Sequence, residues 1–201
     1  TDYFVENTSL SINQGALLPL EQIKSNKWIL SQIKSILEVF DLSLTTPFKD
    51  TAAGLANALD GSSKRAWASN LLYFKGGKIY GFNTDYCGVK DSLKDYVSEG
   101  MRAVILGCGG AGRAAAVALK DMGVDVIIST RDEFTGEPFA FAERIGYCRM
   151  DSVKEFAKKS HIIVDAIPVR HLKLSSFNFR GKVVLEARYN NPTLKRSVIR
   201  D

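Results

Sequence analysis

Residues 102–113 read Arg-Ala-Val-Ile-Leu-Gly-Cys-Gly-Gly-Ala-Gly-Arg, an apolar run that breaks into a glycine loop ahead of an alanine-rich segment. Gly107, Gly109 and Gly112 have the G-x-G-x-x-G spacing of a dinucleotide-binding turn. In such a turn the first glycine allows the tight bend, the second lets backbone approach a pyrophosphate, and the third lets the helix pack on the strand. The start of the helix also offers unpaired N–H groups and a positive dipole end to phosphates. Because a second β-type run follows at 124–129, the sequence predicts a dinucleotide site.

The second half of the chain alternates β-type runs with helical stretches. Strands that alternate with helices pair in parallel through right-handed crossovers. We therefore predict an α/β fold, with a Rossmann-type doubly wound parallel sheet of strand order 3-2-1-4-5 in a dinucleotide-binding domain over residues 100–201. The expected strands are Arg102–Leu106, Val124–Ser129, Gly146–Met150, Ile162–Ala166 and Val183–Ala187, and the clearest helix is Ser152–Lys159.

The sequence of the first half predicts a small α/β domain over residues 1–99. We expect this domain to bind substrate and to carry the catalytic residues. Two of its strand-type runs flank Gly76-Gly77, a dipeptide typical of a tight hairpin turn. Asn83-Thr84-Asp85 follows the second run, and these residue types are also favoured helix caps. The expected elements are helices over 21–40, 50–59 and 84 to about 100, and strands over 42–44, 66–74 and 78–82.

The composition is that of an ordinary globular chain, with 45% apolar and 24% charged residues. The net charge of +5 is scattered, which suits small anions but is too diffuse to indicate a nucleic acid. The three cysteines form no C-x-x-C pair, so we expect free thiols in a reducing compartment and no metal site. No apolar run approaches membrane-spanning length, and Asp2 and Glu6 disfavour a signal peptide. We expect a cytoplasmic monomer or homodimer with no nucleic-acid or membrane partner.

A dinucleotide site beside a small second domain favours hydride transfer, with the substrate held between the domains. One side chain must then take or return the hydroxyl proton. His161 and His171 lie in the nucleotide half, where an exposed or capping role is the better interpretation. Lys49 and Asp85 each follow a strand-to-helix break, so both can lie at one sheet edge, with Lys49 shuttling a proton and Asp85 orienting it. Two solvated surface charges are the alternative, and spacing alone favours that alternative.

Six short segments, in order along nearly the whole chain, resemble motifs of the shikimate dehydrogenase family. The resemblance implies an NADP-dependent oxidoreductase that interconverts 3-dehydroshikimate and shikimate, in the shikimate pathway to chorismate and the aromatic amino acids. The segments are Ser9–Ser11 (S-x-S), Thr45–Lys49 (V-T-x-P-x-K), Ser69-Asn70 (a hairpin asparagine), Gly81–Gly88 (G-x-N-T-D-x-x-G), Gly107–Arg113 (G-A-G-G-A-G/S-R) and Tyr189–Thr193 (Y-x-P-x-x-T).

The resemblance also implies roles for single residues. Lys49 is implied as the proton shuttle, and Asp85 as the group that binds substrate hydroxyls and positions the lysine. A carboxylate and a polyol both need paired polar groups around them. The implied substrate-binding residues are Ser9, Ser11 and Thr45 for the carboxylate, Asn70 for a ring hydroxyl, and Tyr189 near the nicotinamide.

The choice of cofactor depends on the residues that end the second strand of the nucleotide half. Ser129–Asp132 resembles the family's N-R-T segment, in which Arg131 would stack on adenine and pair with the 2′-phosphate of NADP. Asp132 can instead accept from a free ribose 2′-hydroxyl, so NAD is possible. We expect NADP. The expected cofactor-binding residues are Gly107, Gly109, Gly110, Ala111, Gly112, Thr130, Arg131, Asp132 and Ile167.

Several positions depart from the family pattern. Ser43, Leu71 and Arg170 stand where asparagine, threonine and glycine are usual. The first half is also short and the chain stops early, which fits either a minimal enzyme or part of a longer one. The alternatives are an NAD-dependent quinate/shikimate dehydrogenase, a non-catalytic nucleotide- or shikimate-sensing regulator on the same scaffold, and an oxidoreductase with an unrelated substrate. The retained Lys49 and Asp85 favour the enzyme.

Overall fold

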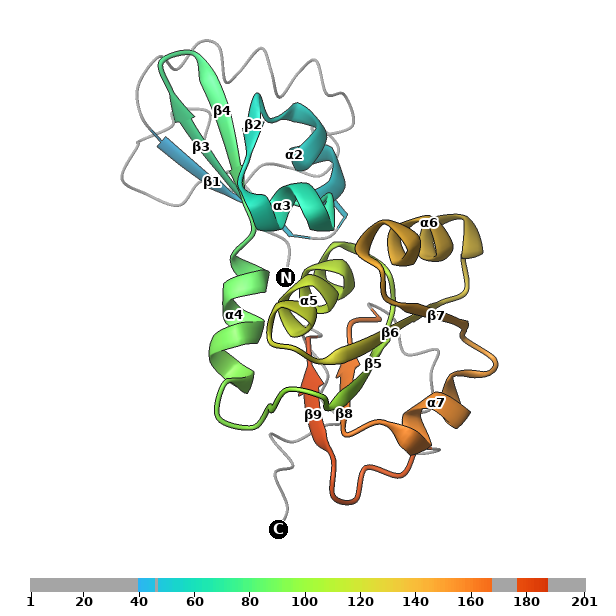
Figure 1. Ribbon diagram of the computed structural model, residues 1–201. Helices are drawn as coiled ribbons and strands as arrows, with labels where there is room; N and C mark the ends of the chain where they lie inside the picture. Colours follow the sequence, from blue (N-terminus) through green and yellow to red (C-terminus); the bar gives the residue numbers. More distant parts are fainter. Residues whose placement is uncertain (1–39, 46, 168–176, 188–201) are drawn as a thin grey trace, which may run out of the picture.

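The computed structural model describes residues 40–45, 47–167 and 177–187 (Figure 1). Their strands form two sheets that follow one another along the chain. Almost all of the helix expected over 21–40 lies outside the described residues, and its last residue, Phe40, begins a strand. Ser9, Ser11, Arg170, His171 and Tyr189 also lie outside them.

The first sheet has four strands in the order β1-β3-β4-β2. Strands β3 (Leu71–Lys75) and β4 (Lys78–Phe82) form the expected antiparallel hairpin, with both turn glycines, Gly76 and Gly77, at positive φ. Strand β1 (Phe40–Ser43) pairs antiparallel with β3. Helix α2 (Lys49–Leu55) covers one face through Ala52, which packs against Leu72, Phe74 and Ile79.

Several expected boundaries in this half are wrong, beginning with the strand expected over 42–44, which is β1 at Phe40–Ser43. The helix expected over 50–59 is α2, which ends at Leu55, and β2 (Ala58–Leu59) follows as a strand parallel to β4. The strand expected from Ala66 begins only at Leu71, because Asp60 accepts from the N–H groups of Ser62 and Ser63 and starts helix α3 (Gly61–Ala66). Helix α4 (Thr84–Leu93) ends well before Gly100.

The second sheet confirms the predicted fold class. All five strands are parallel, in the order β7-β6-β5-β8-β9, which is the expected 3-2-1-4-5. The strands are β5 (Arg102–Leu106), β6 (Asp125–Thr130), β7 (Gly146–Arg149), β8 (Ile162–Asp165) and β9 (Val183–Glu186), and the helices are α5 (Gly110–Asp121), α6 (Glu133–Glu143) and α7 (Val153–Lys159).

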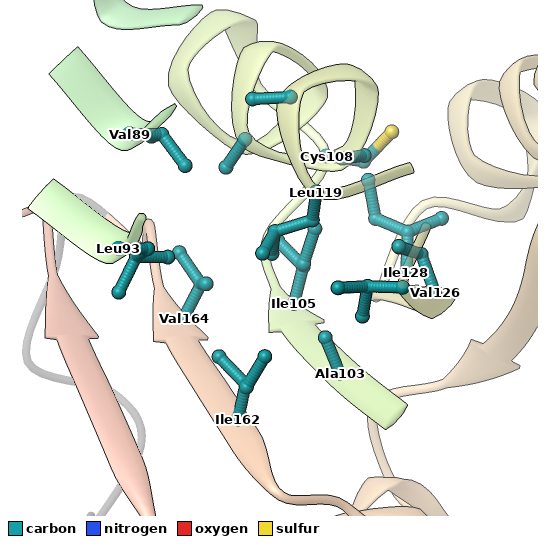
Figure 2. Packing of buried hydrophobic residues seen from close by; sticks show 14 of the residues in the cluster. Val89, Leu93, Ala103, Ile105, Cys108, Leu119, Val126, Ile128, Ile162 and Val164 are labelled. Carbon is teal, nitrogen blue, oxygen red and sulfur yellow. The ribbon is translucent and has the colours of Figure 1, made fainter. Parts of the chain in front are cut away.

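The core of this half lies between the sheet and the two helices α4 and α5 (Figure 2). Ile105 and Val164 of the central strands face Leu119 of α5 and Leu93 of α4. Alternate residues point to the other face, where Val104 packs in a second cluster beneath α7. Helix α4 therefore links the first sheet to the core of the second. No helix among the described residues combines the length and apolar character that crossing a membrane requires.

The cap at Asp60 makes the first prediction. Replacing Asp60 by alanine should lower the free energy of unfolding by about 1 kcal/mol, the usual effect of losing an N-cap carboxylate. Lys64→Ala, at an exposed position of the same helix, is the matched control and should change little. Urea titrations of both variants near neutral pH measure the difference. Equal urea midpoints for the parent chain and Asp60→Ala would contradict the assignment of Asp60 as the cap of α3.

The same cap has a predictable pH dependence. Burial raises the pKa of Asp60, but hydrogen bonds from Ser62 and Ser63 outweigh it and hold the pKa below its ordinary value. A lowered folded-state pKa stabilises the fold above the pKa of the unfolded chain, and that stability is lost as the pH falls through the folded pKa. The difference in free energy of unfolding between the parent chain and Asp60→Ala should therefore become smaller in acid, and urea titrations at acidic pH measure it.

Candidate active site

The two charged residues singled out in the sequence form a direct ion pair. Lys49 opens α2 and Asp85 lies in the first turn of α4. The Nζ of Lys49 donates to Oδ2 of Asp85 at 2.5 Å, and their side chains are 4% and 21% exposed. A lysine this deeply buried needs a charged partner, because an isolated buried ammonium is strongly unfavourable. The alternative of two solvated surface charges is therefore wrong.

Asn70 ties the carboxylate of Asp85 to the hairpin. Its Nδ2 donates to Oδ1 of Asp85 at 3.0 Å and to the hydroxyl of Thr84 at 2.8 Å. Its Oδ1 accepts from the N–H of Thr84 at 2.8 Å. The two carboxylate oxygens of Asp85 thus face different donors, the ammonium and the amide. An ionised carboxylate has room for about four hydrogen bonds, so Asp85 retains acceptor capacity toward solvent.

The capping interpretation of the Asn83-Thr84-Asp85 segment holds for its first residue. Asn83 is buried, and its Oδ1 accepts from the N–H of Tyr86 at 3.2 Å, which caps α4. Its Nδ2 donates to the carbonyl of Ala68 at 2.8 Å. Because Asn83 does the capping, Asp85 is available to face Lys49.

The remaining expected substrate residue in the described chain is Thr45. It is half-buried in the turn before α2, and its carbonyl accepts from the N–H of Phe48 at 2.9 Å. Two of the family departures lie nearby, since Ser43 and Leu71 are register partners across β1 and β3. His161 is exposed, and its Nδ1 accepts from the N–H of Arg102, which agrees with a non-catalytic role.

The three glycines of the loop have the steric environments that the G-x-G-x-x-G pattern requires. Gly107 lies at φ +102°, in the region that favours glycine, and a Cβ there would also meet the carbonyl of Ala166. A Cβ on Gly112 would overlap the carbonyl oxygen of Gly107, so only glycine lets α5 start this close to β5. No atom lies within 4 Å of the Cβ position at Gly109, which faces open space.

A cavity of about 700 Å³ opens beside this loop. Gly110, Ala111 and Gly112 do not line it, and instead form the first turn of α5 behind the loop. Among the expected residues Gly107, Gly109, Thr130, Arg131, Asp132 and Ile167 line it, and the others are Asp50, Cys108, Arg113, Thr135, Arg149, Met150, Asp151 and Ala166.

Arg149 and Asp151 are cavity residues that the sequence analysis missed. Arg149 ends β7 and is the register partner of Thr130 at the end of β6. Binding sites of open parallel sheets lie at the carboxyl ends of the strands. Examining the end of every predicted strand, and not only the second, would have found Arg149. Its Nη1 donates to Oε2 of Glu133 at 2.8 Å.

The carboxylate expected to accept from a ribose, that of Asp132, is already hydrogen-bonded within the protein. Asp132 caps α6, and its Oδ1 accepts from the N–H of Phe134 at 3.1 Å. Its Oδ2 accepts from the hydroxyl of Thr135. Arg131, the neighbouring cation, is exposed where it lines the cavity.

Burial makes the cysteine of the loop a poor nucleophile. Cys108 is buried, and burial raises its pKa to about 11 even though Arg113 acts in the opposite direction. The thiol is therefore neutral at physiological pH, and only a thiolate is strongly nucleophilic. All three cysteines are free, as expected from their spacing.

Two family models match the chain. Residues 1–103 match the UvrA DNA-binding domain, and residues 97–174 match the NADPH-binding domain of acetohydroxy acid isomeroreductase. The second match agrees with the glycine loop and the parallel sheet. The first names a different class of protein, although the described part of that half carries the Lys49–Asp85 pair.

Curated relatives match half of the chain or more. It is 36% identical over 129 residues to shikimate dehydrogenase (NADP(+)) of Ignicoccus hospitalis, covering 64% of this chain and 48% of the relative. It is 42% identical over 106 residues to the protein of the same name from Halobacterium salinarum, covering 52% and 40%. The chain spans about half the length of these relatives.

A solved structure shows the same fold. Shikimate 5-dehydrogenase of Thermus thermophilus, in complex with NADP(H) and shikimate, superposes with a TM-score of 0.64 and 23% identity. The likeness covers 81% of this chain and 64% of that chain. It therefore includes much of the first half as well as the parallel sheet.

The crowding at Gly112 makes the second prediction. Gly112→Ala should lower the free energy of unfolding by about 1–3 kcal/mol, the usual cost of overpacking a close contact. Gly88→Ala is the matched control, because Gly88 lies inside α4 with nothing within 4 Å of its Cβ position. That change should stabilise by roughly 0.5–1 kcal/mol, the helix preference for alanine. Urea titration compares the two, and a stabilising Gly112→Ala would contradict the packing.

Proposed function

Because the chain belongs to the shikimate dehydrogenase family, we propose that it interconverts 3-dehydroshikimate and shikimate by hydride transfer with NADP(H). This reaction would serve the shikimate pathway to chorismate and the aromatic amino acids. The observation that carries the proposal is the buried Lys49–Asp85 pair at the end of the first sheet. Relatives named as NADP(+)-dependent shikimate dehydrogenases support the same assignment.

Lys49 is the proposed proton shuttle. Bound NADP(H) would accept or supply the hydride at the reacting carbon. In the reducing direction the ammonium of Lys49 donates a proton to the carbonyl oxygen, and in the oxidising direction the neutral amine removes the hydroxyl proton. Asp85 holds the ammonium through Oδ2, which orients it and offsets the cost of burying its charge.

The substrate's ring hydroxyls would meet Asp85 and Asn70. Asp85 keeps acceptor capacity for a hydroxyl, and the Asn70 amide, whose two N–H groups bond to Asp85 and Thr84, holds that carboxylate in place. Asn70 itself is proposed for a ring hydroxyl on the family resemblance. Thr45, in the turn before Lys49, is proposed for the carboxylate. Ser9 and Ser11, for the carboxylate, and Tyr189, near the nicotinamide, are proposed on the family resemblance alone.

The cavity beside the glycine loop fits a dinucleotide. The open space at Gly109 allows a pyrophosphate to approach backbone N–H groups at the start of α5. Arg131 would pair with a 2′-phosphate. Asp132 is the acceptor that NAD enzymes use for the ribose, but here it caps α6. This favours NADP over the NAD-dependent alternative. Gly107, Gly110, Ala111, Gly112, Thr130 and Ile167 complete the proposed set.

The wider organisation is proposed on the same basis. Residues 1–99 would bind substrate and carry the catalytic pair, and residues 100–201 would bind the dinucleotide. The intact Lys49–Asp85 pair supports an enzyme over a non-catalytic sensor, which would have no use for a buried proton shuttle. We propose a cytoplasmic monomer or homodimer whose partners are small molecules and not nucleic acids.

A single assay tests the function. NADPH absorbance should fall when 3-dehydroshikimate is added to the purified chain, and shikimate should reduce NADP⁺ in the reverse direction. Quinate and NAD⁺ in parallel reactions distinguish the close alternatives. Binding of NADPH without turnover of either substrate would favour the sensor. Tight binding of DNA fragments without turnover of either substrate would instead favour a DNA-binding protein, the class that the match of residues 1–103 names.

The third prediction concerns the chemical step. Lys49→Met should lower kcat by about 10²–10⁴-fold, the usual scale for general acid–base catalysis. NADPH affinity should survive, because the glycine loop is intact. Lys64→Met, at an exposed position of α3, is the control and should keep the parent kcat. Asp85→Asn should impair both turnover and substrate binding, since it keeps the shape but removes the charge. Parent-rate turnover by folded Lys49→Met would refute the mechanism.

The fourth prediction concerns cofactor choice. Arg131→Ala should weaken NADPH binding by roughly 1.5–3 kcal/mol, the scale of a charge-assisted hydrogen bond. NADH binding should change much less, because NADH has no 2′-phosphate. Arg180→Ala, an exposed arginine that does not line the cavity, is the control. Fluorescence titration with both nucleotides measures the difference. Equal losses of affinity for NADPH and NADH would mean that Arg131 only stacks on adenine.

A further inference from the structure

Arg113 is the last residue of the glycine motif, and the proposed function gives it no role. It lies in α5 and is buried, at 5% exposure. Its guanidinium points back to the first half of the chain, where Nε donates to the carbonyl of Ala66 at 2.6 Å and Nη2 to that of Trp67 at 3.2 Å. Nη2 also pairs with Oδ1 of Asp50 at 2.5 Å.

The same guanidinium also holds the loop itself. Nη1 of Arg113 donates to the carbonyl of Cys108 at 2.8 Å. Arginine has five N–H donors, and these four contacts leave at most one of them for any other acceptor. Arg113 lines the cavity, but it has little capacity left to bind a phosphate. Its contacts instead join the loop, α2 and the end of α3 at one point.

This junction lies beside the catalytic lysine. Asp50 directly follows Lys49 at the start of α2. A Cβ placed on Gly110 would lie 3.1 Å from the Cβ of Lys49 and 3.2 Å from its Cδ. The first turn of α5 therefore covers the aliphatic stem of Lys49, and this contact contributes to its burial.

We propose that Arg113 is a positioning residue that fixes the start of α5 and the nucleotide loop against the stem of Lys49. The proposal rests on the proposed function only where it predicts kinetics. Its physical basis is that one rigid, planar group bonds to both sides of the contact at once, which a flexible point charge does not reproduce. A displacement of about 1 Å at a reacting group can cost about 10²-fold in rate.

A second arginine offers a matched control. Arg65 of α3 also bridges the two halves, through Glu143 at 2.7 Å and Asp121 at 2.9 Å. Its side chain is 35% exposed, and it does not line the cavity. Arg65→Met removes an ion-pair network of the same kind without touching the Lys49 contact. It separates loss of stability from loss of positioning.

The experiment compares Arg113→Lys, Asp50→Asn and Arg65→Met with the parent chain. We measure kcat and KM, the NADPH dissociation constant, thermal unfolding, and acetic anhydride labelling of Lys49 by mass spectrometry. Arg113→Lys should lower kcat by about 10- to 100-fold with a much smaller change in NADPH affinity. Lys49 should label severalfold faster, because its stem loses its cover. Arg65→Met should lower stability but leave kcat and Lys49 labelling unchanged.

A double variant distinguishes positioning from general damage. In a Lys49→Met background, Arg113→Lys should cause no further loss of kcat, because groups that act through one another are non-additive. If the double variant loses kcat by the product of the two single-variant factors, the proposal is overturned. Parent-like kcat and Lys49 labelling in Arg113→Lys would also overturn it. A loss confined to NADPH affinity would also overturn it, by making Arg113 a cofactor contact.

Two further outcomes are interpretable. If Arg113→Lys does not fold, Asp50→Asn decides the matter, since it removes only the charged partner and should shift kcat and labelling in the same direction. Unchanged values in Asp50→Asn would then overturn the proposal. If the parent chain does not turn over 3-dehydroshikimate, the proposed function fails. The labelling of Lys49 in Arg113→Lys still decides the positioning role.

Discussion

The close approach of α5 to the backbone around it is the constraint on which the site depends. Gly112 lies where a methyl group would overlap the carbonyl of Gly107, and Gly110 lies where one would crowd Lys49 and Ala68. Hydrogen is the only side chain that fits the first position without displacement. These two contacts place the start of one helix against both the strand that precedes it and the lysine of the other half. The cavity beside the glycine loop and the proposed catalytic pair are adjacent for this reason.

Burying charge at this junction requires that each charged group be satisfied. Lys49 has Asp85, Asp85 has Asn70 as well, and Arg113 has Asp50 and three carbonyls. Buried ion pairs contribute little net stability, because desolvation offsets most of the attraction. Their value here is geometric, since each partner restricts the other to one arrangement. The pair that does the proposed chemistry, Lys49 and Asp85, lies within the first half, directly beside Asp50, whose pairing with Arg113 joins the two halves.

The end of the cavity proposed for the cofactor shows how helix capping competes with ligand binding for the same carboxylate. Asp132 is well placed in sequence to accept from a ribose, yet its carboxylate caps α6. The same conflict arises at Asn83-Thr84-Asp85, where Asn83 takes the cap and leaves Asp85 to Lys49. Capping preferences alone do not distinguish these two outcomes, because asparagine and aspartate are about equally good caps. Only the position of each carboxylate relative to the neighbouring chain decides its role.

The sequence by itself determined the doubly wound sheet, its strand order and the glycine loop, because apolar runs, helical spacing and glycine placement are local signals with a direct physical meaning. It also identified the Gly76-Gly77 hairpin and the resemblance that singled out Lys49 and Asp85. It failed over residues 56–70, where β2 is a strand of two residues that exists only through its pairing with β4. The tertiary structure alone decided that Lys49 and Asp85 touch, that Arg149 reaches the cavity and that Arg113 joins the halves. Those contacts join residues 16 to 63 positions apart, and no periodicity in the sequence records which distant side chains a fold brings together.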